Sequence, residues 1–97
     1  MELNIKSAKE IKKLTDSSNL IFQTMEKEKI LNSLKETIEK SAKEGCYGTY
    51  FQRYFEHFNK SEGEIFCSYV ISALEDLGYK VENFDSNCQI KIKVEWE

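Results

Sequence analysis

The chain contains no proline, four glycines and a single arginine among its 97 residues. The lack of proline excludes a proline-rich linker or a collagen-like segment, and a hydrophobic content of 40% excludes a disordered chain. No apolar run approaches the roughly 18 residues that a membrane-spanning helix needs. A chain of this length has room for one hydrophobic core, so we expect a single domain over residues 1–97.

The shortage of arginine limits the partners that the chain can bind. Of the 14 basic residues only Arg53 is an arginine, so the bidentate contacts that dominate phosphate and guanine recognition are nearly missing. The net charge of −3, with lysines interspersed, is too weak for an acidic mimic of DNA. We therefore expect a protein or small-molecule partner, and neither nucleic acid nor a membrane.

Motifs for metal binding or catalysis are also missing. Cys46, Cys67 and Cys88 lie 21 residues apart without a paired spacing, which indicates reduced thiols rather than a disulfide framework or a zinc site completed by His57. His57 is the only histidine, and no glycine-rich phosphate loop is present. We expect a non-enzymatic protein without metal or cofactor. Because the first residues lack the pattern of a secretory signal, we also expect a cytosolic location.

Helical patterns cover most of the first half of the chain. A capping box at Ser7 and Glu10 predicts a short first helix, and the polar run at 15–19 predicts its end. We therefore expect residues 1–19 to form an N-terminal helical arm on a compact core over 20–97. A second, amphipathic helix is predicted over roughly residues 22–44.

A third helix follows an expected capping box at Ser61 and Glu64, and its wide apolar stripe runs from Ile65 to Leu77. Helix three and the last strand should supply most of the core. The predicted core residues are Leu34, Ile38, Phe66, Val70, Leu74, Ile92, Val94 and Trp96.

Strand patterns occupy the rest. Residues 47–55 are rich in aromatics and favour a strand, although the same residues also match a helical stripe. Residues 79–82 begin a second strand, 85–87 predict a turn, and the strict alternation over 89–96 predicts a last strand with one buried face. The expected fold is α+β, in the order α-α-β-α-β-β, with a small three-stranded, mostly antiparallel sheet. If the last strand lies between the other two, every neighbouring pair is antiparallel, and we expect the three helices to cover one face of the sheet.

Three segments besides the aromatic strand form a pattern over roughly residues 26–97. They are Lys43-Glu44-Gly45, Leu74-Glu75-Asp76-Leu77-Gly78-Tyr79-Lys80-Val81 and Ile90-Lys91-Ile92-Lys93-Val94-Glu95-Trp96. With this pattern the chain resembles small accessory proteins of phages and prophages of low-G+C bacteria. The aromatic run from Tyr47 to Phe58 departs from the plainer strand of such proteins. The resemblance implies a compact protein in the host bacterial cytosol that inhibits or redirects a host protein, such as a defence component.

The candidate binding residues come from the aromatic run. They are Tyr47, Tyr50, Arg53, Tyr54 and His57. Tyrosine and arginine are enriched at binding hot spots, and the same residue types suit stacking on a nucleobase. The first hypothesis is therefore an anti-defence inhibitor that binds a host protein. The alternative is a small-ligand module in which several copies of the chain form a homo-oligomer that sequesters a nucleotide-like signal.

Overall fold

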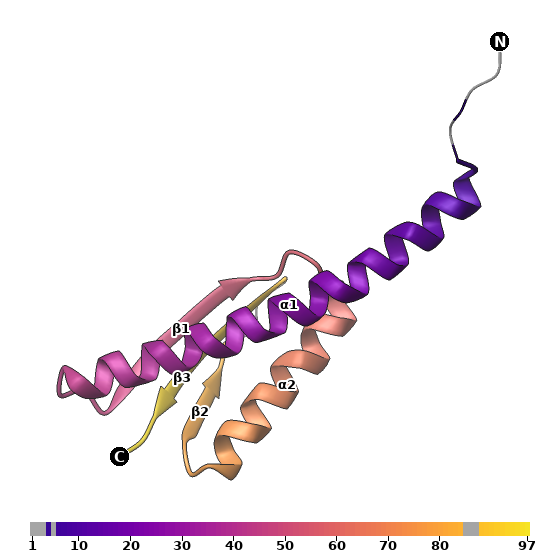
Figure 1. The fold of residues 1–97 in the computed structure, drawn as a ribbon. Coiled ribbons are helices and arrows are strands. Elements are labelled where there is room, and N and C mark those ends of the chain that lie inside the picture. Colours follow the sequence, from indigo (N-terminus) through magenta and orange to yellow (C-terminus); the bar gives the residue numbers. More distant parts are fainter. Residues whose placement is uncertain (1–3, 5, 85–87) are drawn as a thin grey trace.

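The computed structural model describes residue 4, residues 6–84 and residues 88–97, so the turn predicted at 85–87 lies outside the described residues. Two helices and three strands follow one another along the chain (Figure 1). They are α1 (Ala8–Lys43), β1 (Gly48–Tyr54), α2 (Lys60–Asp76), β2 (Lys80–Asn83) and β3 (Gln89–Glu95). No described helix is both long enough and apolar enough to cross a lipid bilayer.

The three strands form one antiparallel sheet in the order β1-β3-β2, which confirms the predicted three-stranded sheet and places the last strand at its centre. Alternation along β3 buries Ile90, Ile92 and Val94 completely, while Lys91 between them is exposed. These three side chains join residues from β1, both helices and the loop after β1 in one core. Its other members are Ile30, Leu34, Phe51, Phe58, Phe66, Val70 and Leu74, and the predicted core residues Ile38 and Trp96 pack against it half-buried.

The predicted break between a first and a second helix is wrong. Residues 8–43 form one continuous helix, so the element order is α-β-α-β-β and two helices, not three, cover the sheet. The polar run at 15–19 contains no glycine or proline, and each of its residues lowers helix stability by less than about 0.7 kcal/mol relative to alanine. Helix growth from neighbouring turns outweighs costs of this size.

Only the second half of α1 packs on the rest of the molecule. Its buried residues are Gln23, Glu26, Ile30 and Leu34, and the stretch from Ala8 to Phe22 has no buried side chain. Figure 1 shows this stretch running past the sheet and α2 into open space. The molecule is therefore elongated, with extents of 68 × 23 × 20 Å.

The N-cap of helix α2 lies two residues before the expected cap, Ser61. The cap is Asn59, whose side chain accepts a hydrogen bond from the backbone N–H of Glu62, while the Glu62 side chain accepts one from the N–H of Asn59. The wide apolar stripe is also only partly buried, because Ile65 and Leu77 are 71% and 76% exposed. A helix against a three-stranded sheet buries one narrow face, and Ile65 lies beside that face.

Candidate functional site

The pairing of β1 with β3 determines on which face of the sheet each candidate residue lies. Tyr50 pairs with Lys93 and Tyr54 with Gln89, whereas Phe51 pairs with the buried Ile92. Because side chains alternate along a strand, Tyr50 and Tyr54 lie on the face that no described helix covers. We call this surface the open face. Its side chains are Tyr50, Gln52 and Tyr54 from β1, Lys80 and Glu82 from β2, Phe84, and Gln89, Lys91, Lys93 and Glu95 from β3.

Aromatic rings and lysines alternate across the open face. The rings of Tyr50 and Phe84 have centroids 6.2 Å apart, which links the two edges of the sheet across β3. The Nζ atom of Lys93 lies 5.5 Å from the Tyr50 ring centroid, and that of Lys91 lies 5.8 Å from the Phe84 ring centroid. The open face therefore offers flat apolar area with positive charges beside it.

The two lysines differ in their acidic neighbours. Lys93 Nζ lies 3.0 Å from Glu95 Oε1, and the hydrogen bond to Glu95 and the charge of that carboxylate raise the pKa of Lys93. Within the described part of the chain Lys91 has no such ion pair, and it contacts the Phe84 ring. Among the described residues of the open face, Lys80 and Lys91 are therefore exposed lysines without an ion pair to a carboxylate of this chain.

Tyr47 extends this surface at the end of the sheet. It lies just before β1, its carbonyl oxygen accepts a hydrogen bond from the Trp96 N–H, and its side chain is 65% exposed. A shallow hollow of about 340 Å³ lies between Tyr47, Tyr50, Lys93 and Glu95. Three of the five candidate residues, Tyr47, Tyr50 and Tyr54, are therefore reached from the open face or its rim.

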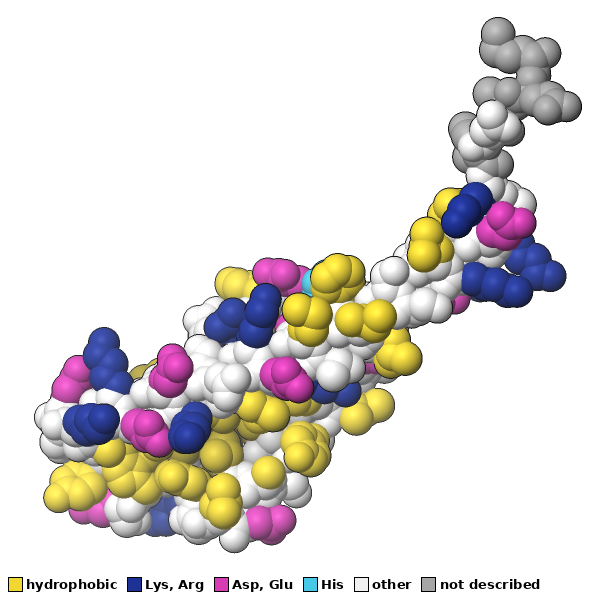
Figure 2. Space-filling model, in the orientation of Figure 1, with side chains coloured by type: hydrophobic (Ala, Val, Ile, Leu, Met, Phe, Trp, Pro, Cys, Tyr) yellow, Lys and Arg dark blue, Asp and Glu magenta, His cyan; other side chains and the backbone are white. Residues whose placement is uncertain are grey.

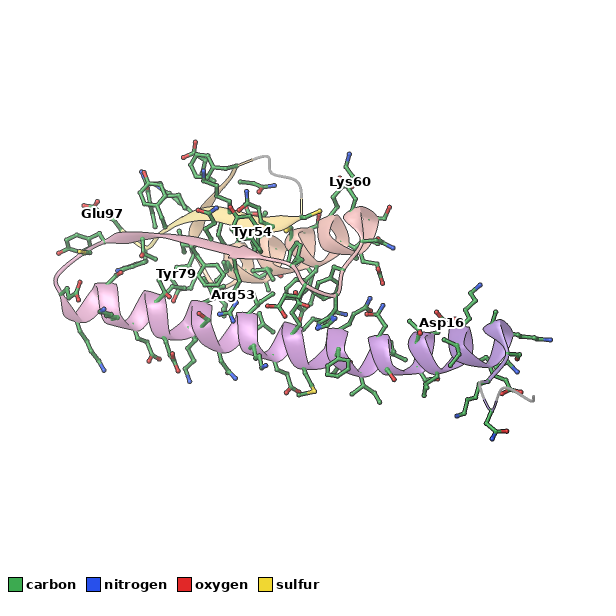
Figure 3. The ribbon with its side chains drawn as sticks, turned by 90° about the horizontal axis from the view of Figure 1, so that it is seen from above. Asp16, Arg53, Tyr54, Lys60, Tyr79 and Glu97 are labelled. Carbon is green, nitrogen blue, oxygen red and sulfur yellow. The ribbon has the colours of Figure 1, made fainter. Side chains whose placement is uncertain are left out.

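Arg53 lies apart from the tyrosines that it was expected to join. It pairs with Ile90, so its side chain leaves β1 on the face that carries the helices, and Figure 3 shows it on the α1 side of the strand. There it borders a pocket of about 250 Å³ at the sheet edge, which we call the edge pocket. The pocket is lined by Phe22, Met25, Glu26 and Lys29 of α1 and by Arg53, Tyr54, Glu56 and His57.

His57 forms one wall of the edge pocket. Its ring stacks on Phe22 with centroids 5.1 Å apart and planes 20° apart, and its Nε2 lies 3.9 Å from Glu56 Oε2. The edge pocket thus combines stacked rings with two cations, Arg53 and Lys29. Tyr54 borders both this pocket and the open face.

Two buried polar residues of α1 hold the loop between β1 and α2 in place. The Glu26 carboxylate accepts hydrogen bonds of 2.9 Å from the backbone N–H groups of Glu56 and His57. Gln23 Nε2 donates to the His57 carbonyl oxygen and to Glu62 Oε2, both at 2.8 Å. We call Gln23 and Glu26 the loop anchor. The sequence analysis missed it, and the available signal is that both residues share the α1 face of Ile30 and Leu34.

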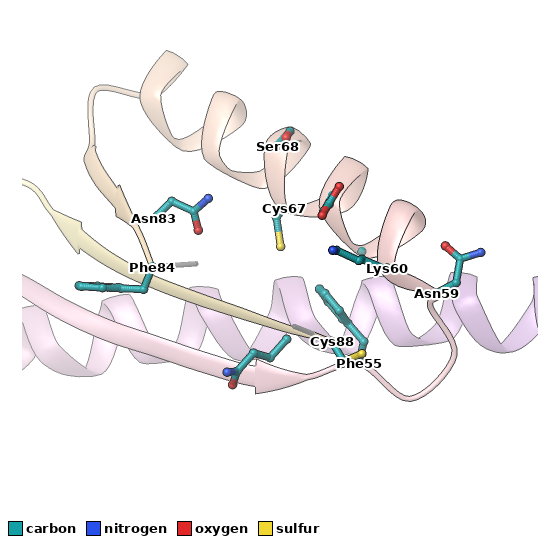
Figure 4. Close-up of a pocket in the computed structure, with 11 residues that line it drawn as sticks. Phe55, Asn59, Lys60, Cys67, Ser68, Asn83, Phe84 and Cys88 are labelled. Carbon is teal, nitrogen blue, oxygen red and sulfur yellow. The ribbon is translucent and has the colours of Figure 1, made fainter. Parts of the chain in front are cut away.

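Cys67 and Cys88 line a separate pocket of about 340 Å³ between α2 and the sheet. Figure 4 shows Cys67 projecting from α2 toward the strands, with Cys88 close to Phe55. All three cysteines are free. Burial, and secondarily the negative charge of Glu64, raises the pKa of the Cys67 thiol, which keeps it in the less reactive protonated form.

No group of three or more histidine, cysteine or acidic side chains that could hold a metal ion occurs among the residues described. No protein-family model matches the chain, and neither a curated protein nor a solved structure matches it significantly. Proposals about function therefore rest on the surfaces described above.

Proposed function

We propose that the protein is a non-enzymatic binding protein that inhibits or redirects a second protein, which it contacts through the open face. The observation that carries this proposal is the exposure of Tyr50 and Tyr54, at 65% and 67%, on a sheet face without a covering helix. Isolated exposed tyrosines are common, but rings gathered on one flat surface are typical of interaction sites.

The chemistry of the open face indicates the kind of partner. Tyr50, Tyr54 and Phe84 supply large contact area at low cost in side-chain entropy, which is why aromatic residues are enriched at the centres of interfaces. Lys80, Lys91 and Lys93 outnumber Glu82 and Glu95, so the face favours an acidic surface. The proposed partner is therefore a folded protein with apolar groups flanked by carboxylates. The resemblance to phage accessory proteins is consistent with a partner from a host bacterium.

A second candidate function, sequestration of a nucleotide-like molecule, is favoured by the edge pocket. The stacked rings of Phe22 and His57 could hold a base, and Arg53 and Lys29 could pair with phosphates. The pocket volume of about 250 Å³ lies below the range of roughly 300–1,000 Å³ that is usual for ligand sites. We therefore place this candidate second.

The test uses the fact that Tyr50 and Arg53 lie on opposite faces of one strand. Tagged wild-type protein and the variants Tyr50→Ala, Lys91→Glu and Arg53→Glu are used to capture proteins from a lysate of the bacterium that carries the gene. The captured protein is then purified and titrated against each variant. We expect affinity to fall at least about 30-fold for Tyr50→Ala, the loss typical of a hot-spot residue, and clearly for Lys91→Glu, while Arg53→Glu binds like wild type.

Full binding by Tyr50→Ala and Lys91→Glu would refute the open face as the site. The second candidate is tested by melting the protein with a panel of nucleotides, since a ligand at about 100 times its Kd adds about 2.7 kcal/mol to the stability. A nucleotide-dependent rise in Tm that Arg53→Glu abolishes and Tyr50→Ala retains would favour the edge pocket.

A further inference from the structure

The exposed part of α1 carries a second apolar stripe, separate from the face that packs on the sheet. Ile11, Leu14, Ile21, Phe22 and Met25 are 43–62% exposed. With 100° between successive residues, these five side chains and Ser18 fall within about 100° of the helix circumference. We call these six residues the α1 stripe. Hydrophobic side chains are visible along this part of the helix in Figure 2.

The α1 stripe points away from the molecule's own core. The buried residues Glu26 and Ile30 lie on a different side of the helix, against β1 and the loop that follows it. Of the stripe residues, Phe22 contacts the folded body through its stacking on His57. A partner could therefore lie along the stripe without displacing the sheet or α2.

The helix itself indicates that this stretch gains stability from a partner. Residues 8–22 include Thr15, Asp16, Ser17 and Asn19, which are weak helix formers, and the stretch has no buried side chain. Isolated helices shorter than roughly 12–15 residues are marginal in water, and most helices in proteins depend on packing of an apolar face. Contact along the α1 stripe would supply that packing.

The spacing of the stripe suits a second copy in antiparallel orientation. Ser18 lies at its centre, with Leu14 and Phe22 four residues to either side and Ile11 and Met25 seven residues to either side. A two-fold axis at Ser18 therefore pairs Leu14 with Phe22 of the partner and Ile11 with Met25, while Ile21 lies opposite Thr15. The small serine at the crossing point lets the two helices approach closely.

Charge and area agree with this arrangement. The same axis places Glu28 opposite Ala8 of the partner, the first residue of α1, where the positive end of the helix dipole favours a carboxylate. If each of the five apolar side chains exposes on the order of 100 Å², two copies remove about 1,000 Å² of apolar surface from water. With the polar groups beside the stripe, the total buried surface area comes near the roughly 1,200–2,000 Å² that stable protein–protein interfaces bury.

We propose that two copies of this chain form an antiparallel dimer through the α1 stripe, with the two-fold axis near Ser18. This interface contains no residue of the open face, but it shares Phe22 and Met25 with the edge pocket, whose lining also includes Tyr54.

The first test measures molecular mass by sedimentation over a range of concentrations. Wild-type protein should sediment at about twice the 11.4 kDa of one chain. Ile21→Glu should shift the mass to that of the monomer with unchanged Tm of the folded body. Leu20→Glu is the matched control, because Leu20 is equally exposed, at 66%, but lies outside the stripe. It should remain dimeric.

The second test fixes the orientation by cross-linking with a short bis-maleimide in a variant whose three native cysteines are replaced by serine. Ser18→Cys should cross-link to its own copy. Glu10→Cys should not, because the antiparallel arrangement separates the two positions by about 24 Å along the helix.

Three outcomes would overturn the proposal. They are a monomeric wild type at every concentration, a dimer lost in Leu20→Glu but kept in Ile21→Glu, and efficient cross-linking of Glu10→Cys. The second outcome would move the contact to the side of α1 that carries Leu20.

Discussion

Removal of the Glu26 carboxylate tests whether the loop anchor stabilises the fold. Its two oxygens accept hydrogen bonds of 2.9 Å from the N–H groups of Glu56 and His57, and Glu26 is only 9% exposed. In Glu26→Gln one oxygen becomes an NH₂ group, which cannot accept, so one N–H loses its acceptor and the other keeps only a neutral one. A hydrogen bond to a charged group contributes about 1.5–3 kcal/mol, so we expect Glu26→Gln to lose about 2 kcal/mol of unfolding free energy.

Thermal and urea unfolding followed by circular dichroism measure this loss. For a domain of this size, 2 kcal/mol lowers Tm by about 8–16 °C. Glu26→Ala should lose about 2–4 kcal/mol, since both N–H groups then lose their acceptor. Glu36→Ala, an exposed glutamate on the same helix, is the matched control and should change stability by less than about 0.5 kcal/mol. Equal stability of Glu26→Ala and Glu36→Ala would refute the anchoring role.

Three further changes test the packing and the thiols. Gly63→Ala should lose about 1–3 kcal/mol in urea unfolding, because the new Cβ would lie 2.8 Å from Cε2 of Phe55; an unchanged midpoint would mean that the Phe55 ring moves freely. Ile92→Lys should abolish cooperative unfolding while Lys91→Glu stays within about 0.5 kcal/mol of wild type, since Ile92 is fully buried and Lys91 exposed; equal tolerance would contradict the one-sided sheet. In the folded protein Cys67 should be alkylated more slowly than the exposed Cys46 and Cys88, and its reaction should need a higher pH because the pKa of its thiol is raised. Labelling rates are measured by mass spectrometry, and equal rates for all three cysteines would disprove this prediction.

The parts of the fold that depend on a strong local pattern could be predicted from the sequence. Alternation over 89–96 led to the buried residues Ile90, Ile92 and Val94 and to an antiparallel sheet with one covered face, as observed. The strand predicted over 47–55 is confirmed as Gly48–Tyr54. Helix continuity through residues 15–19 could not be predicted in the same way, because weak helix formers lower the stability of a turn without ending it.

The loop anchor illustrates a different limit. Gln23 and Glu26 share the helix face of Ile30 and Leu34, but as polar residues they add nothing to the apolar pattern that predicts burial. Their burial depends on backbone N–H and C=O groups about 30 residues further along the chain, which local periodicity does not contain. Long-range pairing of this kind appears only when the elements are placed together.

The separation of Arg53 from Tyr50 could have been predicted. Once residues 47–55 are assigned to a strand, even-numbered Tyr50 and Tyr54 must face one way and odd-numbered Phe51 and Arg53 the other. The candidate residues were grouped in one site as if they lay on one face of a helix, although residues 47–55 were assigned to a strand. The open face and the edge pocket are therefore two separate surfaces, and different variants test each of them.

The two proposals together predict how affinity depends on the assay. The α1 stripe contains no residue of the open face, so an antiparallel dimer should leave both open faces accessible. A dimer can then engage two copies of a partner fixed densely on a surface, and such bivalent attachment raises apparent affinity by about 10²–10⁴-fold. Ile21→Glu should lose this gain on the surface, while titration in solution gives the wild-type affinity per site. If Ile21→Glu also weakens binding in solution, the α1 stripe contacts the partner itself, and the open face does not form the whole interface.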